Sequence, residues 1–319
     1  MKNLEPLKSN ILISSAGTGN AFATAEAIVS NFSQHANLFL TDINPPELVS
    51  SATFTKNFTS SPLISDQSYK AFMLRHIESN NINICFPFVD HDILELCKWQ
   101  ESNELDSKIY IPLNNILIAE ICSDKYKTYH WLKENDLPTP ETYLLDDLDL
   151  DMEYLIKPRS GFGSTVQKLT GRLAKQTINS ENFIAQELCT SPEITIDVFN
   201  DKSKKQFRYL CRERIETRAG VCTKAKIFIN PELEKLARVI ADKLSLSYFC
   251  FQVMIIDEQW VVTDINPRYG AGTAMCSAVG MDFYSAMIAD VLELEPEIYF
   301  SNFNSEAYVT RQYRNILFK

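Results

Sequence analysis

The chain has 319 residues, enough for two or three domains with substantial cores. Hydrophobic residues make up 45% and charged residues 23%, a composition typical of folded proteins that argues against a disordered chain. The formal net charge of −10 argues against nucleic acid as the principal partner, because phosphate backbones are bound by a basic excess. No stretch reaches the ~18–20 apolar residues needed to cross a bilayer, so we expect no membrane partner.

The cysteines and the start of the chain bear on its compartment. Eight cysteines are scattered without any C-x-x-C pair, which favours reduced thiols over disulfides or zinc ligands. Charges at Lys2, Glu5 and Lys8 precede a short apolar run, so no signal peptide is predicted. We therefore expect a cytoplasmic protein. The sequence leaves its oligomeric state open, with a homodimer as one option.

Strands and helices alternate in the first third of the sequence. An apolar run at 10–15 is followed by a glycine turn and a helical pattern at 21–32. A second strand, 37–40, a helix at 69–81 and a third strand within 82–90 continue the alternation. Such alternation is typical of a parallel sheet. We predict a doubly wound α/β domain over 1–115, with its ligand edge at the carboxyl ends of the strands.

The pattern changes beyond this domain. Residues 113–118 are predicted to form a strand, and residues 123–137 a capped amphipathic helix ended by Pro138 and Pro140. Four more strands are expected at 153–156, 183–187, 193–199 and 206–212. A helix around 233–244 then precedes a hairpin of 249–256 and 260–265. Strands and helices without strict alternation predict an α+β architecture here.

Glycine is scarce, and its placement is informative. Six of the nine glycines fall in three G-x-G pairs, at 17/19, 161/163 and 270/272, each after a predicted strand. Missing side chains at such turns let backbone N–H groups approach a ligand. At the first pair, Phe22 stands where a dinucleotide fingerprint needs a third glycine. The only candidate ribose partner is Asp42, at the end of the second strand. A plain strand-to-helix turn is the competing interpretation there.

The second glycine pair lies in a polar, cationic setting. Lys157, Arg159, Ser160 and Ser164 surround it, which indicates a loop that covers phosphates, with a plain hairpin as the alternative. The loop is not of the Walker A type, because no G-K-[ST] occurs in the chain.

The strand at 261–268 has the clearest chemistry. Since side chains alternate along a strand, Asp264, Asn266 and Arg268 are expected on one face. Across the hairpin, Gln252 adds another amide oxygen. Mg²⁺ prefers hard oxygen ligands, with one or two carboxylates and substrate phosphates, and arginine neutralises a transferring phosphoryl group. The alternative is a polar edge strand that faces solvent.

In this order, these motifs resemble the ATP-grasp superfamily, in particular the branch of carbamoyl phosphate synthetase large chains and short carboxylate-amine ligases. The resemblance spans nearly the whole chain. Its motifs are the D-K-x₆-L helix at 124–132, the strand and glycine loop at 156–164, the A-Q-E-L-C segment at 185–189 and the strand that ends in N-P-R at 266–268. The resemblance implies a pre-ATP-grasp domain over 1–115, a small subdomain with the phosphate-covering loop over 116–188, and a large subdomain with the metal and substrate site over 189–319.

The resemblance also implies roles for individual residues. Nucleotide binding would involve Lys125, Lys157, Ser160, Gly161, Gly163, Ser164, Gln186, Glu187, Leu188 and Glu193. The metal, Mg²⁺ or Mn²⁺, would be bound by Gln252, Asp264 and Asn266. Catalytic roles would fall to Lys125, Lys157, Arg212 and Arg268. The usual acid before the N-P-R motif is glutamate, so the shorter Asp264 leaves open whether one or two metal ions bind.

Two further segments have open interpretations. Residues 212–220 with Lys224 resemble a segment whose basic groups face the phosphates and the acyl substrate, and a solvated charged hairpin is the alternative. The turn at 268–273 offers N–H groups for a substrate carboxylate.

The function implied is a ligase that uses Mg-ATP to phosphorylate a small-molecule carboxylate and passes the acyl group to an amine. One alternative is a nucleotide-binding regulatory module without turnover. Another is an enzyme that forms carbamate or carboxyphosphate.

Overall fold

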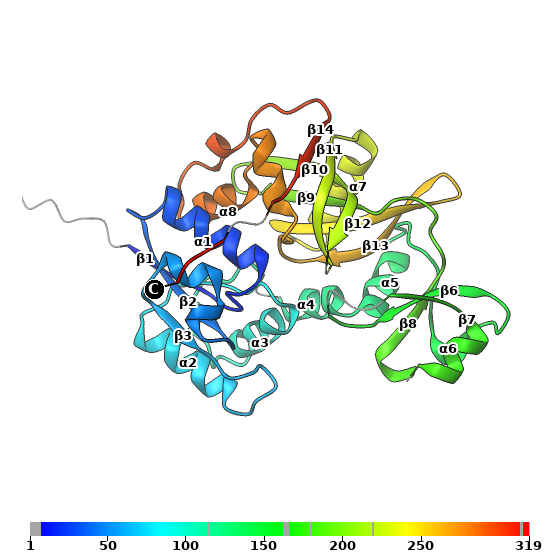
Figure 1. Cartoon of the computed structure of the whole chain (residues 1–319), viewed down its shortest axis with the longest axis horizontal. Helices are drawn as coiled ribbons and strands as arrows, with labels where there is room; N and C mark the ends of the chain where they lie inside the picture. Colours follow the sequence, from blue (N-terminus) through cyan, green and yellow to red (C-terminus); the bar gives the residue numbers. More distant parts are fainter. Residues whose placement is uncertain are drawn as a thin grey trace, which may run out of the picture.

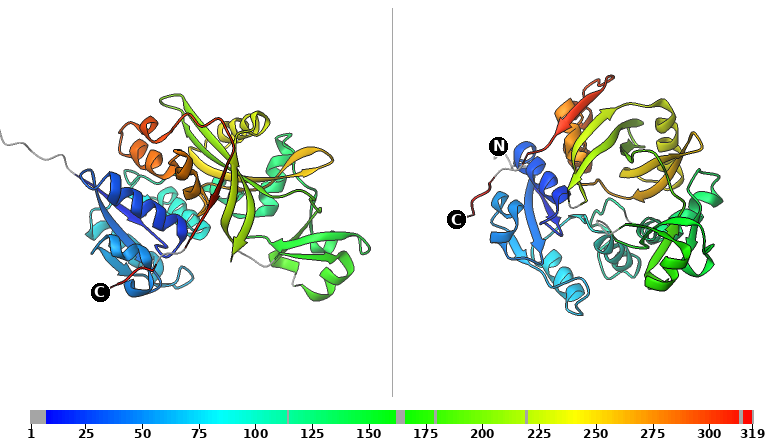
Figure 2. Two further views of the ribbon diagram at one scale, coloured as in Figure 1. Left: turned by 45° about the horizontal axis from the view of Figure 1, so that its top comes forward. Right: turned by 45° about the vertical axis from the view of Figure 1, so that its right-hand side comes forward.

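The computed structural model describes residues 8–113, 115–161, 166–178, 180–218, 220–312 and 315–318. Gly163 and Ser164 of the expected phosphate loop lie outside the described residues. Figure 1 shows the N-terminal sheet and a small antiparallel sheet at opposite ends of the molecule, with a large sheet and the helices α3 to α5 between them. The two further views of Figure 2 show the same separation of the two ends.

The N-terminal group is a parallel sheet with the strand order β3-β2-β1-β4. Its elements are β1 (Ser9–Ile13), α1 (Gly19–Asn31), β2 (Ala36–Asp42), β3 (Phe58–Ser60), α2 (Tyr69–Ser79), β4 (Ile84–Phe86) and α3 (Asp90–Glu101). Helices α2 and α3 contribute to a core on one side, and α1 to a core on the other. The predicted strand-helix alternation and parallel sheet are confirmed.

The first glycine pair forms the turn between β1 and α1. Thr18 caps the helix by accepting the N–H of Ala21, so Gly19 is its first residue. The N–H of Gly17 donates to the carboxylate of Asp42 at 2.7 Å. Asp42 therefore holds the turn together from the end of β2.

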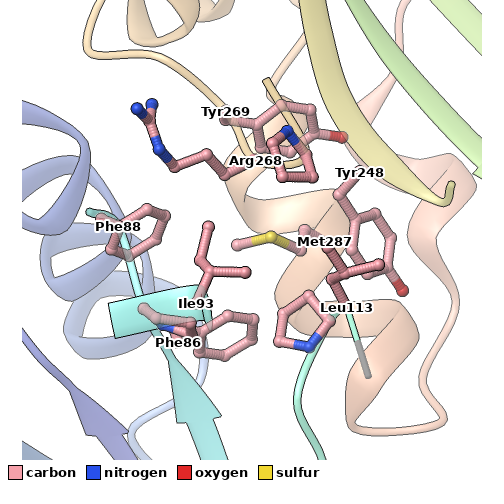
Figure 3. A pocket seen from close by; sticks show the side chains of 11 residues that line it. Phe86, Phe88, Ile93, Leu113, Tyr248, Arg268, Tyr269 and Met287 are labelled. Atoms are coloured by element: carbon pink, nitrogen blue, oxygen red, sulfur yellow. The ribbon is translucent and has the colours of Figure 1, made fainter. Parts of the chain in front are cut away.

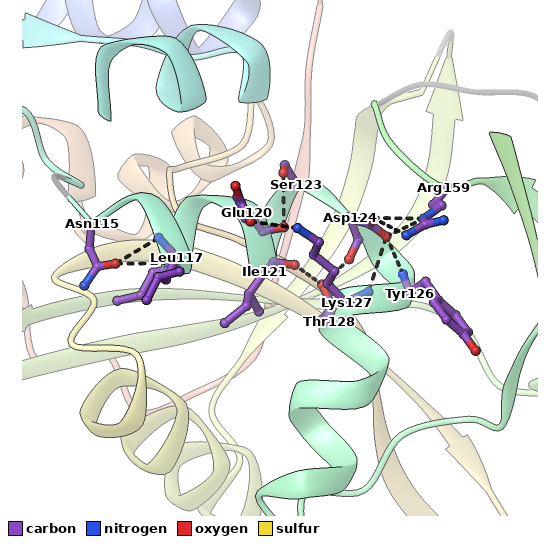
Figure 4. Close-up of polar contacts among 11 residues, drawn as sticks. Asn115, Leu117, Glu120, Ile121, Ser123, Asp124, Tyr126, Lys127, Thr128 and Arg159 are labelled. Carbon is purple, nitrogen blue, oxygen red and sulfur yellow. Dashed lines mark hydrogen bonds and ion pairs between the residues drawn. The ribbon is translucent and has the colours of Figure 1, made fainter. Parts of the chain in front are cut away.

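The linker to the second half of the chain differs from the expectation. The strand predicted at 113–118 is wrong: helix α4 (Ile116–Ser123) begins there, followed at once by α5 (Lys125–Glu134). Asn115 accepts the N–H groups of Leu117 and Ile118 and so caps α4, and Asp124 caps α5 (Figure 4). A short apolar run alone does not distinguish a strand from a helix. Here the side chain of Asn115 caps the N-terminus of a helix.

The small sheet is antiparallel, with the strand order β5-β8-β6-β7. Its elements are β5 (Thr142–Leu144), β6 (Glu153–Pro158), β7 (Gln167–Thr170), α6 (Gly171–Thr177) and β8 (Phe183–Gln186). The large sheet has the order β13-β12-β9-β10-β11-β14. Its elements are β9 (Ile194–Asp201), β10 (Gln206–Arg218), β11 (Val221–Phe228), α7 (Pro231–Lys243), β12 (Tyr248–Ile256), β13 (Gln259–Asn266), α8 (Phe283–Val291) and β14 (Ala307–Thr310).

Short 3₁₀ helices complete the described elements. They are η1 (Pro46–Leu48), η2 (Ser50–Phe54), η3 (Leu145–Asp147), η4 (Ser180–Asn182), η5 (Thr273–Val279) and η6 (Pro296–Tyr299). Helix α8 packs against α1, so the elements around the large sheet and the N-terminal group share one hydrophobic core. Within the described ranges, no helix is both long and apolar enough to span a membrane. All eight cysteines are free thiols.

Candidate active site

Lys157, near the carboxyl end of β6, is a buried cation. Its side chain is 8% exposed, and its ammonium group donates to the side-chain oxygen of Gln186 at 2.8 Å and to the backbone oxygen of Thr263 at 3.2 Å. Burial lowers the pKa of Lys157 to about 8; Asp264 opposes this shift and Lys125 adds to it. Lys157 therefore lies between the small sheet and the strand of the expected metal ligands, with no carboxylate partner among the described residues.

Lys125, the first residue of α5, faces the start of the glycine loop. Its ammonium group donates to the carbonyl of Gly161 at 3.1 Å, and its backbone N–H donates to the carbonyl of Arg159. Arg159 in turn forms an ion pair of 2.8 Å with Asp124, which Figure 4 shows beside the start of α5. Gly161 has φ +91°, a conformation that favours glycine. The two expected phosphate-binding lysines thus lie at the base of the same loop.

The expected adenine-binding segment follows β8. Gln186 is buried between Lys157 and the hydroxyl of Thr142, to which it donates at 3.0 Å. The N–H of Glu187 donates to the carbonyl of Glu141, while the side chain of Glu187 is exposed. Gln186 therefore holds the Lys157 ammonium group, and Leu188, half-buried, continues the segment out of the sheet.

The expected metal face is present on the hairpin β12–β13. Gln252 lies directly opposite Asp264, and Asn266 donates its amide N–H to Asp264 at 3.0 Å, which leaves its amide oxygen for other ligands. The register shifts beside this pair, so Thr263 is an extra residue on β13. The carbonyl of this bulge accepts the hydrogen bond from Lys157. One carboxylate and two amide oxygens fit a hard cation that takes its other ligands from phosphates and water.

Arg268 follows this strand and joins two parts of the chain. Its guanidinium forms hydrogen bonds of 3.0 and 2.9 Å, both to one oxygen of Asp90, the first residue of α3. Figure 3 shows the Arg268 guanidinium pointing away from an apolar cavity lined by Phe86, Phe88, Ile93 and Met287, among others. Asp90 therefore fixes Arg268 at the edge of the N-terminal sheet.

Arg212 occupies a different environment from the one expected. Its side chain is 3% exposed and pairs with fully buried Asp197 at 3.2 Å. Burial alone would lower the pKa of Arg212, but Asp197 raises it above its ordinary value. Asp197 also accepts hydrogen bonds from Thr273 at 2.6 Å and Cys276 at 3.5 Å. Arg212 is thus part of the core beneath the third glycine pair, and a direct catalytic contact does not fit this burial.

Two other predicted residues have protein partners. Glu193, the expected ribose-binding acid, is half-buried and forms an ion pair with Arg214 of β10. Glu216 forms an ion pair of 2.8 Å with Lys224 across the β10–β11 hairpin. Part of this segment is therefore an internally paired hairpin, as the alternative interpretation expected.

The structure brings together Lys125, Lys157, Gly161, Gln186 and the metal face. Sequence reasoning missed three residues that hold this site: Asp90, Asp197 and Arg311. Asp90 could have been noted, because it follows a predicted strand at the ligand edge. The other two become recognisable only through distant contacts: Asp197 accepts a hydrogen bond from Thr273, and Arg311 donates one to the carbonyl of Ala271.

Comparison with known proteins bears on the fold of the chain and on the family of its central segment. Residues 122–272 match the family model of the ATP-grasp domain. A search by sequence among curated proteins finds no match.

Several solved structures share the fold over most of the chain. The N5-carboxyaminoimidazole ribonucleotide synthetase of Thermotoga maritima is 15% identical with a TM-score of 0.67, over 90% of this chain and 76% of that one. The corresponding synthetase of Staphylococcus aureus, complexed with ADP, is 14% identical with a TM-score of 0.67, over 95% and 81%. An L-amino acid ligase from Bacillus licheniformis is 15% identical with a TM-score of 0.68, over 92% and 76%. At these identities the likeness shows a common fold.

The fold combines a parallel N-terminal sheet with two antiparallel sheets. Residues 122–272 match the ATP-grasp domain, within a fold that the chain shares with the synthetases and the ligase above. The expected fold class is confirmed. The expectation of an ATP-grasp enzyme that uses ATP with Mg²⁺ or Mn²⁺ is confirmed at the level of this class.

Proposed function

We propose that the chain is a Mg-ATP-dependent carboxylate-amine ligase. The γ-phosphoryl group of ATP passes to an oxygen of a small-molecule carboxylate and ADP leaves. An amine then attacks the acyl carbon, phosphate leaves and the amine loses a proton. The observation that carries this proposal is a pair of lysines, Lys125 and Lys157, that have no carboxylate partner among the described residues and lie beside the Asp264 strand.

The two lysines bind and orient the phosphates of ATP. Lys157 is pre-positioned by Gln186 and by the bulge carbonyl of Thr263, so little conformational freedom is lost when phosphate arrives. Lys125 contacts the first carbonyl of the glycine loop and so couples that loop to the nucleotide. The segment Gln186 to Leu188 supplies the backbone groups beside the adenine.

Gln252, Asp264 and Asn266 are the residues that would hold Mg²⁺. Gln252 and Asp264 are paired across β12 and β13, and Asn266 lies two residues beyond Asp264 on β13, a set of oxygen ligands that suits a hard cation. When bound, the ion would neutralise negative charge on the phosphoryl group that is being transferred. A single carboxylate in this set favours one firmly bound ion.

Arg268 places a positive charge at the junction of the metal strand and the N-terminal sheet. Asp90 keeps the guanidinium in place before substrate binds. We infer that Arg268 orients the carboxylate that is phosphorylated and stabilises charge in the transition state. The protein works in the cytoplasm in this proposal, with small molecules as its partners.

The test is an ADP-release screen of the full chain over pairs of carboxylates and amines, with product masses measured. For an active pair, Asp264→Asn should lower kcat by roughly 100-fold or more and leave ATP affinity much less changed, because the ion stabilises charge that develops during transfer. The control is Asp257→Asn, at the tip of the same hairpin. Unchanged kcat in Asp264→Asn would move the metal site elsewhere, and ADP release without a coupled product would reduce the proposal to an ATPase.

A further inference from the structure

Three aspartates lie near the carboxyl ends of the N-terminal strands. Asp42 ends β2, and Asp90 and Asp92 lie in the first turn of α3, which follows β4. The carboxyl ends of parallel strands form the edge of such a sheet at which ligands bind. Each of the three carboxylates is therefore a candidate for contact with a substrate.

Two of the three carboxylates are fully engaged by the protein. One oxygen of Asp42 accepts the N–H of Gly17, and the other accepts the backbone N–H and the side-chain amide of Asn44. Asp92 is buried, and both of its oxygens accept hydroxyl groups, from Ser14, Ser15 and Tyr69. These two side chains hold the turns at this edge and keep no oxygen without a protein donor.

Asp90 is bonded differently. Its side chain is 14% exposed, and both contacts from Arg268 go to the same oxygen, Oδ1, at 3.0 and 2.9 Å. The other oxygen, Oδ2, accepts no hydrogen bond from any described residue and is not fully buried. An accessible carboxylate oxygen without a donor can form a charge-assisted hydrogen bond to a cationic ligand.

Asp90 also lies close to the proposed reacting groups. Arg268 orients the carboxylate that is phosphorylated, so a ligand bound to Asp90 would lie beside that substrate. Burial raises the pKa of the Cys122 thiol of α4 above its ordinary value, and the carboxylates of Asp264 and Asp90 both add to this rise. The carboxylate of the metal face and that of Asp90 are therefore near the same thiol.

The chemistry of the second step requires such a group. An amine attacks an acyl carbon through its lone pair, but α-amino groups and alkylamines have pKa values of roughly 7.7–10.4, so they arrive largely as ammonium ions. The enzyme must bind this cation and remove a proton from it. The lysines and arginines of the proposed site repel a cation, whereas Asp90 attracts one.

We propose that Asp90 is a catalytic residue of the amine step, in which Oδ2 binds the ammonium group of the second substrate and takes one of its protons. This inference rests on the proposed ligase function. It names the class of the amine as one that is protonated in solution, such as the α-amino group of an amino acid.

The protons and electrons of this step balance. One proton passes from the nitrogen to Asp90, the freed lone pair forms the bond to the acyl carbon, and phosphate leaves with the electron pair of the C–O bond. The second proton of the nitrogen goes to the departing phosphate, and Asp90 returns its proton to solvent. Proton transfer from an ammonium ion to a carboxylate is unfavourable by itself, so the attack must consume the neutral amine as it forms.

The first test separates the amine step from phosphorylation. Hydroxylamine is largely unprotonated in neutral buffer, so it traps an acyl phosphate without the help of a base. The full chain with Mg-ATP is given the standard amino acids and succinate as carboxylates, once with hydroxylamine and once with the standard amino acids as amines. Mass spectrometry measures hydroxamate and coupled product. Asp90→Asn should lower the rate of coupled product by roughly 100-fold or more, and the hydroxamate rate much less.

The control for this test is Glu95→Gln, because Glu95 is on the same helix in a pair with Lys98. It should change neither rate. Equal loss of both products in Asp90→Asn would show that Asp90 acts only through Arg268 and would overturn the proposal, as would an unchanged rate of coupled product. Hydroxamate without coupled product from any pair in the wild type would overturn the class of amine. Absence of both hydroxamate and ADP in the wild type would instead count against the ligase function.

The second test stands even where Asp90→Asn fails to fold. Calorimetry with the wild-type chain saturated with Mg-ADP compares each amino acid with the 2-hydroxy acid of the same side chain, such as alanine with lactate. The best amino acid should bind roughly tenfold or more tightly than its hydroxy analogue, because only the ammonium group forms a charge-assisted hydrogen bond to Asp90. A folded Asp90→Asn should lose this difference. Equal binding of the two compounds, no binding of either, or a difference that persists in Asp90→Asn would overturn the proposal.

Discussion

The cations at the two ends of the site have different partners. In the small subdomain and its preceding helix, Lys157 and Lys125 contact amide and carbonyl oxygens, and no described carboxylate pairs with them. In the large subdomain, Arg212 pairs with Asp197, and Arg268 pairs with Asp90 of the N-terminal sheet. A cation paired inside the core, as Arg212 is, contributes to the architecture, whereas an unpaired one is available to an anionic ligand. Substitution should therefore affect stability at one end and binding at the other.

The largest effect is expected at the paired end. Asp197→Asn removes the charge that neutralises Arg212 inside the core, where both side chains are almost fully buried. Leaving one charge of a buried pair without its partner costs about 3–5 kcal/mol of unfolding free energy. Denaturant unfolding of the wild type and the variant measures this loss. Asp151→Asn is the control, because its pair with Arg172 is largely exposed and should contribute under about 1 kcal/mol. Equal stability of all three proteins would show that this pair is not needed for the fold.

At the small-sheet end of the site, Lys157→Met should weaken nucleotide binding without lowering the stability of the free protein. Affinity for Mg-ATP should fall by roughly 10–100-fold, as expected when a charge-assisted contact to phosphate is lost. Stability of the free protein should not fall, because the substitution removes a buried charge that no carboxylate in the described part of the chain neutralises. Calorimetry measures the first quantity and thermal unfolding the second.

Lys168→Met serves as the control for this variant, since Lys168 is on the adjacent strand β7 in an exposed pair with Glu153. It should change neither quantity appreciably. If Lys157→Met instead destabilises the free protein and leaves nucleotide affinity intact, Lys157 belongs with the structural cations.

The sequence predicted well where the signal was local. The alternation of strands and helices predicted the N-terminal sheet, and the hairpin expected at 249–256 and 260–265 placed Gln252 across from Asp264. Periodicity failed at 113–118, where the apolar run suits either structure and the hydrogen bonds of Asn115 decide for a helix.

What the sequence could not show is which charges pair. Asp90 and Arg268 are 178 positions apart, so no local pattern connects them. Arg212 lies on a strand whose pattern of charged residues suggests a polar face, yet a buried aspartate on the neighbouring strand β9 neutralises it in the core. The bulge at Thr263 also follows from the register between two strands, and it supplies the carbonyl that Lys157 contacts.

The last prediction concerns pH. Both the stability of the free protein and its affinity for Mg-ATP should depend on the protonation of Lys157. Burial lowers the pKa of Lys157 to about 8, below its value in the unfolded chain. Above this pKa the unfolded state binds more protons than the folded state, so the stability of the free protein should rise between pH 8 and about 10. Bound phosphates favour the charged form of Lys157, so nucleotide binding must take up a proton in the same range. Affinity for Mg-ATP should therefore fall, by up to about tenfold per pH unit.

Calorimetry and thermal unfolding across this range should show the two trends in opposite directions for the wild type and for Lys168→Met. In Lys157→Met both trends should be flatter than in the wild type, and trends as steep as in the wild type would assign the titration to another group.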